Sequence, residues 1–397
     1  MMRRDFSAWG RVPWGLGRKG EVGGMEDVRV ERMAETIVRY SARVSRGDLV
    51  CIRGGAAAAP LIRALYRECL GRGAFPYTQV GLPGMDEIFY RHASREQLSY
   101  ISPMARFEIQ RVDVLISILS ETNTRRLSGI APQKQALASK ARQPIMRTFM
   151  RRAAQYEKTR GKGLRWTLTL FPTEAYAQDG EMSLAEYEAF VFAACFADKP
   201  GGVRRWKRVE ARQGEIVRYL KGRKIIELQG PGTDLRVGIA GRSFINCSGH
   251  HNFPDGEVFT GPQESRVDGK IRYSFPACLA GREVEGVELT FESGRVVQAT
   301  AEKNEPFLRK MIGMDAGASR AGEFAFGLNY GIQRFTKNTL FDEKIGGTVH
   351  IALGKGYPES GSRNDSALHW DMVCDLRRGG EIRVDGRPFL KNGKIQI

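Results

Sequence analysis

The stretch DLVCIRGGAAAAPLIRALYRECLGRGAFPYTQV, residues 48–80, carries the clearest structural pattern in the first half of the chain. Residues 48–54 form a short apolar run typical of a strand. Residues 56–74 carry apolar side chains at helical spacing and end at glycine, and residues 75–80 are extended again. A strand, a helix and a second strand in this order predict a βαβ unit with parallel strands.

The same alternation continues through the first half of the chain. Residues 25–41 read as a helix, residues 112–120 as a strand buried on both faces, residues 164–173 as a further strand and residues 184–198 as a further helix. We therefore expect an α/β domain with a parallel sheet over residues 25–205. No G-x-G-x-x-G follows the first strand, so a dinucleotide-binding fold has little support.

Beyond residue 205 the sequence changes character. Short strands separated by glycine turns are expected at residues 224–228, 233–239, 287–301 and 348–354, and helical stretches near 304–313 and 319–326. The sequence thus predicts a second, β-rich mixed α+β domain over residues 206–397. Two domains are also the default for a chain of 397 residues.

The composition is that of an ordinary globular protein, with 42% hydrophobic residues. No apolar run is long enough to cross a membrane, and the six cysteines are scattered without a C-x-x-C, which favours a cytoplasmic protein with buried thiols. Residues 1–24 are rich in Gly and Arg and lack the apolar core of a secretory signal. We expect them to form a loose basic tail, and Met25 is an alternative start.

The net positive charge lies almost entirely in the first half of the chain. Residues 1–230 carry 40 Lys and Arg against 24 Asp and Glu, whereas residues 231–397 carry 22 against 21. A basic surface of this kind suits a phosphate backbone or an acidic partner. No nucleic-acid-binding motif accompanies the charge, however, so a solvated helical face is the favoured explanation.

Histidine and carboxylate residues gather in the second half, where four of the five histidines lie. Glu257 follows a Pro-Asp-Gly turn, and Glu323 lies among apolar and small residues, where an unpaired charge is costly. His350 lies in an apolar strand, with Tyr357 seven residues further on in a glycine-rich loop. Each has an ordinary explanation: Glu257 as a turn cap, Glu323 as a partner of Arg320 or of a lysine, His350 as a core histidine.

The stretch ALHWDMVCDL, residues 367–376, adds His369 and Asp371 two positions apart in an apolar run. Side chains at this spacing share one face of a strand, so both can reach one point. The pair either satisfies itself at a strand end or binds a divalent metal. Three carboxylates and two imidazoles together suit two divalent ions that share a bridging carboxylate and a water.

Several segments resemble, in this order, the aminopeptidase T / aminopeptidase S family of metallopeptidases. They are FPTEAYAQDGEMSLAEY (171–187), PGTDLRV (231–237), NFPDGEVFTGP (252–262), TLFDEKIGGTVHIALGKGYPE (339–359) and SALHWDMVCDL (366–376). The resemblance covers roughly residues 30–397. It implies a two-domain exopeptidase that forms homodimers and removes the N-terminal residue from peptides with a free N-terminus.

The resemblance also implies which residues carry the chemistry. Two divalent ions (zinc, cobalt, manganese or magnesium) would be held by Glu257, Glu323, His350, His369 and Asp371. Tyr357 would be the active-site tyrosine, donating a hydrogen bond to the developing oxyanion. Glu323 or Glu257 is the candidate general base.

The chain departs from the family in the segment CSGHHNFPDGE (247–257), which is unusually rich in histidine. His250 and His251 are either extra groups supporting the metal ligands or the substrate, or a solvent-facing loop pair. Two other functions stay open: a dinuclear hydrolase of a different amide or ester, and a basic nucleic-acid- or acidic-partner-binding protein with a structural metal site.

Overall fold

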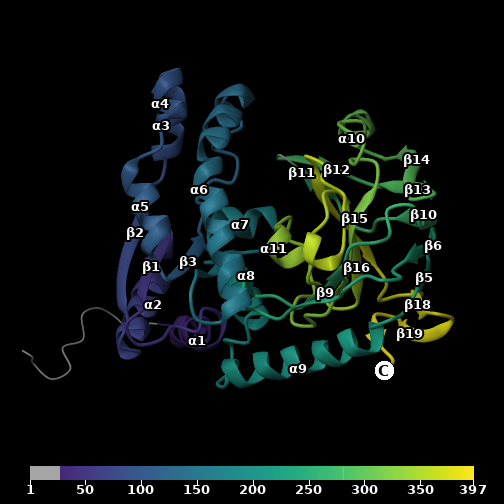
Figure 1. Cartoon of the computed structure of the whole chain (residues 1–397), viewed down its shortest axis with the longest axis horizontal. Helices are drawn as coiled ribbons and strands as arrows, with labels where there is room; N and C mark the ends of the chain where they lie inside the picture. The colour runs from purple at the N-terminus through teal and green to yellow at the C-terminus, as the bar shows by residue number, and fades with distance from the viewer. Residues whose placement is uncertain (1–26, 280) are drawn as a thin grey trace, which may run out of the picture.

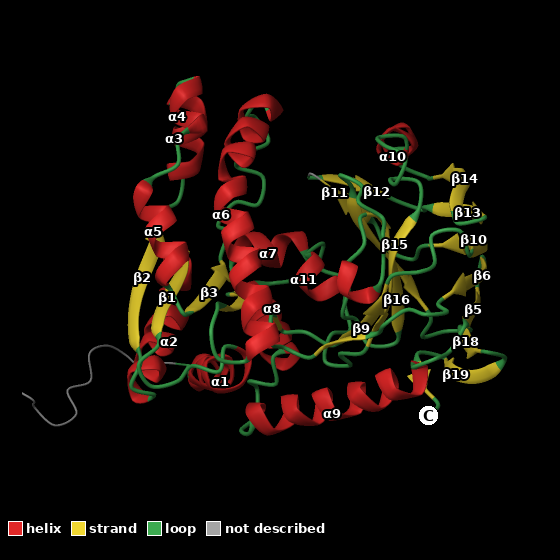
Figure 2. Ribbon diagram, in the orientation of Figure 1, coloured by secondary structure: helices red, strands yellow, loops and turns green. Residues whose placement is uncertain are grey.

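The computed structural model describes residues 27–279 and 281–397 (Figure 1). The predicted loose tail and the alternative start at Met25 lie outside these residues. The described chain combines one parallel sheet with several antiparallel sheets, which confirms the predicted mixed α/β fold class. Figure 2 shows helices concentrated in the first half and strands in the second.

The first sheet is parallel throughout, with the strand order β2-β1-β3-β4-β8. Its strands are β1 (Leu49–Gly55), β2 (Phe75–Gly81), β3 (Val114–Leu119), β4 (Arg165–Leu170) and β8 (Asn252–Phe253). The predicted βαβ unit is confirmed, because β1 and β2 pair in parallel and flank a helix. Strand β3 is mostly buried, as expected when helices cover both faces of a sheet.

Helices cover both faces of this sheet. Apolar side chains of α1, α2 and α8 pack on one face, and those of α5 and α6 pack on the other. The helices of the first half are α1 (Val28–Thr36), α2 (Ala59–Gly71), α3 (Met85–His92), α4 (Arg95–Ser99), α5 (Pro103–Arg111), α6 (Pro132–Thr159), α7 (Glu174–Asp179) and α8 (Leu184–Ala194), with short turns η1 (Ile37–Ser41) and η2 (Ala56–Ala58). Much of the basic segment 140–166 lies on the long helix α6.

The second half is built on two antiparallel sheets. The larger contains β5 (Ile225–Gly230), β6 (Thr233–Gly238), β10 (Val267–Arg272), β13 (Glu288–Glu292), β14 (Arg295–Thr300), β18 (Glu381–Val384), β19 (Arg387–Lys391) and β20 (Lys394–Ile395). The smaller has the order β17-β16-β15-β9-β7, with β7 (Ile245–Cys247), β9 (Glu257–Thr260), β15 (Ala321–Gly327), β16 (Thr348–Gly354) and β17 (His369–Asp375). Apolar side chains from both sheets form one shared core.

Smaller elements complete the second half. They are β11 (Ala277–Leu279), β12 (Arg282–Val284), α10 (Glu305–Ile312), α11 (Thr339–Asp342) and the turn η3 (Pro358–Ser360). The helix expected near residues 304–313 is confirmed as α10.

The helix expected at residues 319–326 is wrong, because these residues form most of strand β15, with all seven strand residues buried. A short apolar run does not by itself distinguish a buried strand from a buried helix. Pairing on both sides, with β9 and β16, decides for the strand.

The two halves are tied together by α9 (Gly202–Leu220), which runs beneath both in Figure 1. The predicted domain boundary at residue 205 falls inside this helix, and the chain later returns to the first sheet as β8 before it enters β9. The division of the chain at residue 205 stays a prediction. Among the described helices, none is long and apolar enough to span a bilayer.

Candidate metal centre

The smaller antiparallel sheet has one apolar face and one face that carries polar groups. Alternation along β9, β15, β16 and β17 sends side chains such as Val258, Phe324, Ile351 and Met372 into the shared core. The neighbouring positions point the other way and are those selected from the sequence: Glu257 on β9, Glu323 on β15, His350 on β16, and His369 and Asp371 on β17. Four adjacent strands therefore bring five polar side chains to one surface.

A β-bulge at Gly322 orients Glu323. The register between β15 and β16 shifts between Ala321 and Glu323, so that Ala321 and Phe324 both pack in the core while Glu323 faces away from it. Only glycine fits at the bulge, because a Cβ on Gly322 would lie 2.1 Å from the carbonyl oxygen of Gly354. The alternative pairing of Glu323 with Arg320 is wrong, since Arg320 instead donates to two backbone carbonyls.

Glu323 lies between the two imidazoles of the site. Its Oε1 is 3.5 Å from His350 Nε2, and its Oε2 is 3.7 Å from His369 Nε2. The carboxylate is almost fully buried, and burial raises its pKa, although His350 opposes this effect. One carboxylate thus offers one oxygen to each histidine.

Each histidine has a further carboxylate partner. His350 Nε2 lies 3.4 Å from Glu257 Oε2, and His369 Nε2 lies 3.3 Å from Asp371 Oδ2. His369 also places Nδ1 2.8 Å from the carbonyl oxygen of Lys355.

Surrounding charge decides the protonation of the two imidazoles. Burial alone would lower their pKa values, but the carboxylates outweigh it. Glu323 and Glu257 raise the pKa of His350 to about 9. Asp371 and Glu323 raise the pKa of His369 to about 10. The same histidines hold the pKa of Asp371 well below its usual range, despite its burial.

Tyr357 borders this group. Its ring packs edge-on against His369 with ring centres 5.5 Å apart, and it also contacts Phe259. Partial burial, together with the charges of Glu323 and Asp371, raises the pKa of the phenol well above its usual value. The hydroxyl therefore keeps its hydrogen at neutral pH and can donate it.

Several buried polar atoms at the site have no hydrogen-bond partner in the described parts of the chain. They are both ring nitrogens of His350, Oε2 of Glu257 and Oδ1 of Asp371. Buried polar groups normally have hydrogen-bond or ligand partners, so these unpaired atoms indicate a ligand-binding site. Carboxylate oxygens and imidazole nitrogens are ligands of divalent metal ions, so the residues present fit such ions.

The donor atoms form two sets that suit one ion each. Glu257, Glu343 and His350 make up the first group, and Glu323, His369 and Asp371 make up the second; within each, the donor atoms lie within 4.8 Å of one another. Because Glu323 also approaches His350, the two groups adjoin. All five residues selected from the sequence are thus brought together.

Sequence reasoning missed Glu343 and Lys344. The run Asp-Glu-Lys at residues 342–344 stands between the apolar residues Phe341 and Ile345, and this placement was the available signal. Lys344 is completely buried, with Nζ 2.5 Å from Glu343 Oε2 and 3.1 Å from Glu257 Oε1.

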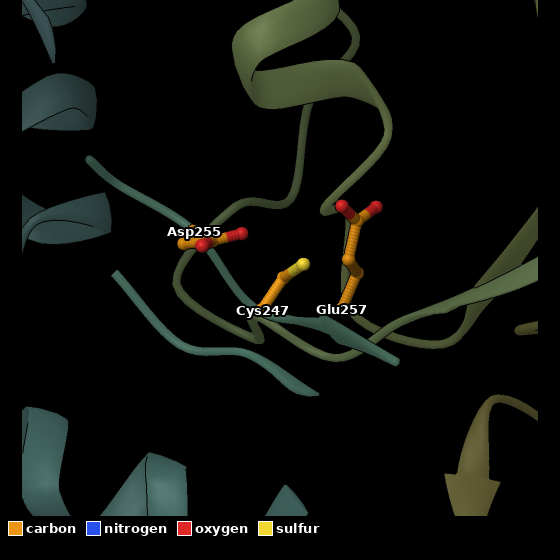
Figure 3. A group of neighbouring side chains, drawn as sticks. All are labelled: Cys247, Asp255 and Glu257. Carbon is orange, nitrogen blue, oxygen red and sulfur yellow. The ribbon is translucent and has the colours of Figure 1, made fainter. Parts of the chain in front are cut away.

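A third group lies beside the first and was also missed. Figure 3 shows Cys247, Asp255 and Glu257 directed toward a common space, and their donor atoms lie within 4.8 Å of one another. Asp255 accepts hydrogen bonds from the amides of Gly249 and Gly256, and burial raises its pKa to about 7.

His250 and His251 lie against the first sheet instead of among the five ligand candidates. His250 packs against Tyr40 with the two rings tilted, and places Nε2 3.1 Å from Glu210 Oε1. His251 stacks on Trp166 of β4, with ring centres 4.7 Å apart. Their backbone carbonyls accept hydrogen bonds from β4, so the pair helps to attach the two halves of the chain.

The chain is similar to known proteins over most of its length. The family model of the thermophilic metalloproteases (M29) matches residues 26–394. Aminopeptidase T of Thermus thermophilus is 29% identical over 92% of this chain and 98% of its own length. Aminopeptidase 2 of Geobacillus stearothermophilus is 27% identical over 92% of this chain and 95% of its own length.

Solved structures show the same fold. Wild-type AmpT from Thermus thermophilus superimposes with a TM-score of 0.79 at 26% identity, covering 93% of this chain and 99% of that one. A dioxygenase of Pseudomonas putida KT2440 matches with a TM-score of 0.58 at 13% identity, over 92% of this chain and 96% of that one, and shares the fold alone. The family resemblance found in the sequence is confirmed.

Proposed function

The chain belongs to the thermophilic metalloprotease family M29, and we propose that it is an aminopeptidase that releases the N-terminal residue of peptides with two divalent metal ions. The observation that carries the two-ion proposal is the placement of Glu323 between His350 and His369, with one oxygen toward each ring. A carboxylate in this position can bridge two ions. The names of the relatives support the choice of substrate.

In this proposal the two donor groups have separate tasks. Glu257, Glu343 and His350 would hold the first ion, and Glu323, His369 and Asp371 would hold the second. Zinc, cobalt, manganese or magnesium suits such an oxygen and nitrogen set. Bound ions supply Lewis-acid chemistry, lowering the pKa of a water molecule and polarising the scissile carbonyl.

Protein groups orient the substrate and its charges. Tyr357, beside His369, keeps its hydroxyl hydrogen and donates it to the carbonyl oxygen as negative charge develops there. The cluster of carboxylates attracts the free amino group of a peptide, which favours removal of the first residue over internal cleavage.

We also propose that the protein works as a homodimer, as the family resemblance implies. Strand β2 is an edge strand of the first sheet and carries Phe75 and Val80, which are 66% and 47% exposed. An unpaired edge with apolar side chains is suited to association with a second copy. Analytical ultracentrifugation of the wild type and of Val80→Glu tests this: a dimer that the substitution dissociates is expected, and a monomeric wild type contradicts it.

The decisive experiment measures leucine release from an unblocked leucyl peptide by metal-loaded protein, with and without a chelator. Glu323→Gln is expected to lower the rate by more than about 100-fold and to reduce metal content. Glu292→Gln, an exposed carboxylate on β13 of the other sheet, is the matched control and should retain full activity.

The outcomes separate the alternatives. Release that needs both the metal and Glu323 supports the aminopeptidase. Folded, metal-saturated protein that is inert on a panel of unblocked peptides contradicts it, and activity on another amide or ester would point to a different dinuclear hydrolase. Steeply salt-dependent binding of nucleic acid without hydrolysis would favour the basic binding protein.

A further inference from the structure

Lys344 is a buried cation inside the candidate metal centre. Its side chain has 0% exposure, and it follows Glu343 directly in the sequence, just ahead of strand β16. Burying an ammonium group is costly unless carboxylates compensate it closely. The role of Lys344 therefore depends on which carboxylates contact it.

Those partners are two members of the first donor group. Lys344 Nζ lies 3.1 Å from Glu257 Oε1 and 2.5 Å from Glu343 Oε2. The other oxygen of Glu257, Oε2, lies 3.4 Å from His350 Nε2 and has no hydrogen bond from any described residue. Lys344 thus occupies one oxygen of Glu257 and leaves the second directed at His350.

The same ammonium also lies beside the third group, because Glu257 belongs to both groups. Burial raises the pKa of Asp255 and of Cys247, and the nearby charge of Lys344 only partly opposes this effect. The space shared by Cys247, Asp255 and Glu257 in Figure 3 therefore already lies close to a protein cation. For this reason we assign no third metal ion to these residues.

We propose that Lys344 is a positioning residue for the first metal ion: it fixes the carboxylates of Glu257 and Glu343 so that a free oxygen of Glu257 faces His350. The proposal rests on the proposed function, because it assumes that the first donor group binds an ion. Groups that orient metal ligands typically contribute about 10- to 100-fold to metal affinity.

The test compares Lys344→Met in two backgrounds that each retain one donor group. His369→Ala leaves the first group intact, and His350→Ala leaves the second. Titration calorimetry with Zn²⁺ and with Co²⁺ measures affinity in each, and circular dichroism checks that the variants fold. Lys270→Met, which removes an exposed lysine paired with Glu288 at 2.6 Å, is the matched control.

We expect Lys344→Met to weaken binding about 10- to 100-fold in the His369→Ala background and less than about twofold in the His350→Ala background. Equal affinity with and without Lys344, or equal weakening in both backgrounds, would overturn the proposal. A wild type that binds no ion would instead contradict the proposed function. If the methionine variant does not fold, Lys344→Gln removes the charge while it keeps hydrogen-bond donors and gives the same comparison.

Discussion

His369 donates its Nδ1 hydrogen to the carbonyl oxygen of Lys355 across 2.8 Å. A carbonyl oxygen can only accept, so this contact places the hydrogen of the neutral ring on Nδ1 and turns Nε2 toward Asp371 and Glu323. A backbone group on the loop after β16 therefore orients an imidazole on β17. Metal-binding histidines are commonly oriented in this manner.

This relationship predicts different outcomes for two substitutions of His369. In His369→Asn the amide nitrogen can still reach the Lys355 carbonyl, but nothing replaces Nε2. In His369→Gln the longer side chain can offer an oxygen near the position of Nε2. We expect the glutamine variant to retain weak binding of the second ion and the asparagine variant to lose it, as measured by metal content after dialysis. Equal retention by both variants would contradict this account.

Metal binding should release protons. In the metal-free protein His350 and His369, with pKa values of about 9 and about 10, are charged at neutral pH, whereas a metal ion requires the neutral ring. We expect release of about two protons per protein at pH 7. Titration calorimetry in buffers of different ionisation enthalpy measures the number. Binding at pH 7 without proton release would show that the rings are already neutral.

The same pKa values predict how the metal-free protein responds to base. Both values lie above the ordinary value for histidine, so their contribution to stability is complete below about pH 6.5 and is lost as the pH rises through 9 and 10. The melting temperature of metal-free protein should therefore fall between about pH 8 and pH 10.5. A melting temperature that stays constant or rises over this range would contradict the charged pair.

Gly322→Ala should damage the site through the backbone. The added Cβ would lie 2.1 Å from the carbonyl oxygen of Gly354 and 2.5 Å from that of Lys355, so β15 and β16 must separate at the bulge. We expect a loss of about 1–3 kcal/mol in the free energy of unfolding, measured by denaturant titration. Because Glu323 follows the bulge, metal affinity should fall as well. Gly71→Ala, where a Cβ meets open space and φ is not positive, serves as the control.

Tyr357→Phe should reduce catalysis without affecting metal binding. The ring still packs against His369 and Phe259, but the hydrogen-bond donor is lost. We expect kcat to fall by about 100- to 1,000-fold, the range for removal of one oxyanion donor, with metal content unchanged. Tyr100→Phe, which changes an exposed tyrosine in the first half of the chain, is the control. A variant with normal kcat would remove Tyr357 from the mechanism.

The sequence predicted the main elements because their patterns are local. The βαβ unit at residues 48–80 combines a strand period, a helix period and a terminating glycine within one stretch. The pair His369 and Asp371 shares a strand face because side chains two positions apart must do so. The helix expected at residues 319–326 failed because a short apolar run fits either element, and only the pairing of β15 with β9 and β16 decides.

Residue type and spacing along the chain are enough to predict the fold class, the family resemblance and the five residues that gather on one sheet face. Tertiary structure alone decided which carboxylate stands between the two histidines, because that depends on strand register and on a one-residue bulge at Gly322. It also decided the place of Lys344, whose partner Glu257 is 87 positions away in the sequence yet within 3.1 Å in space. Burial creates these charge relationships, and burial is a property of the folded chain.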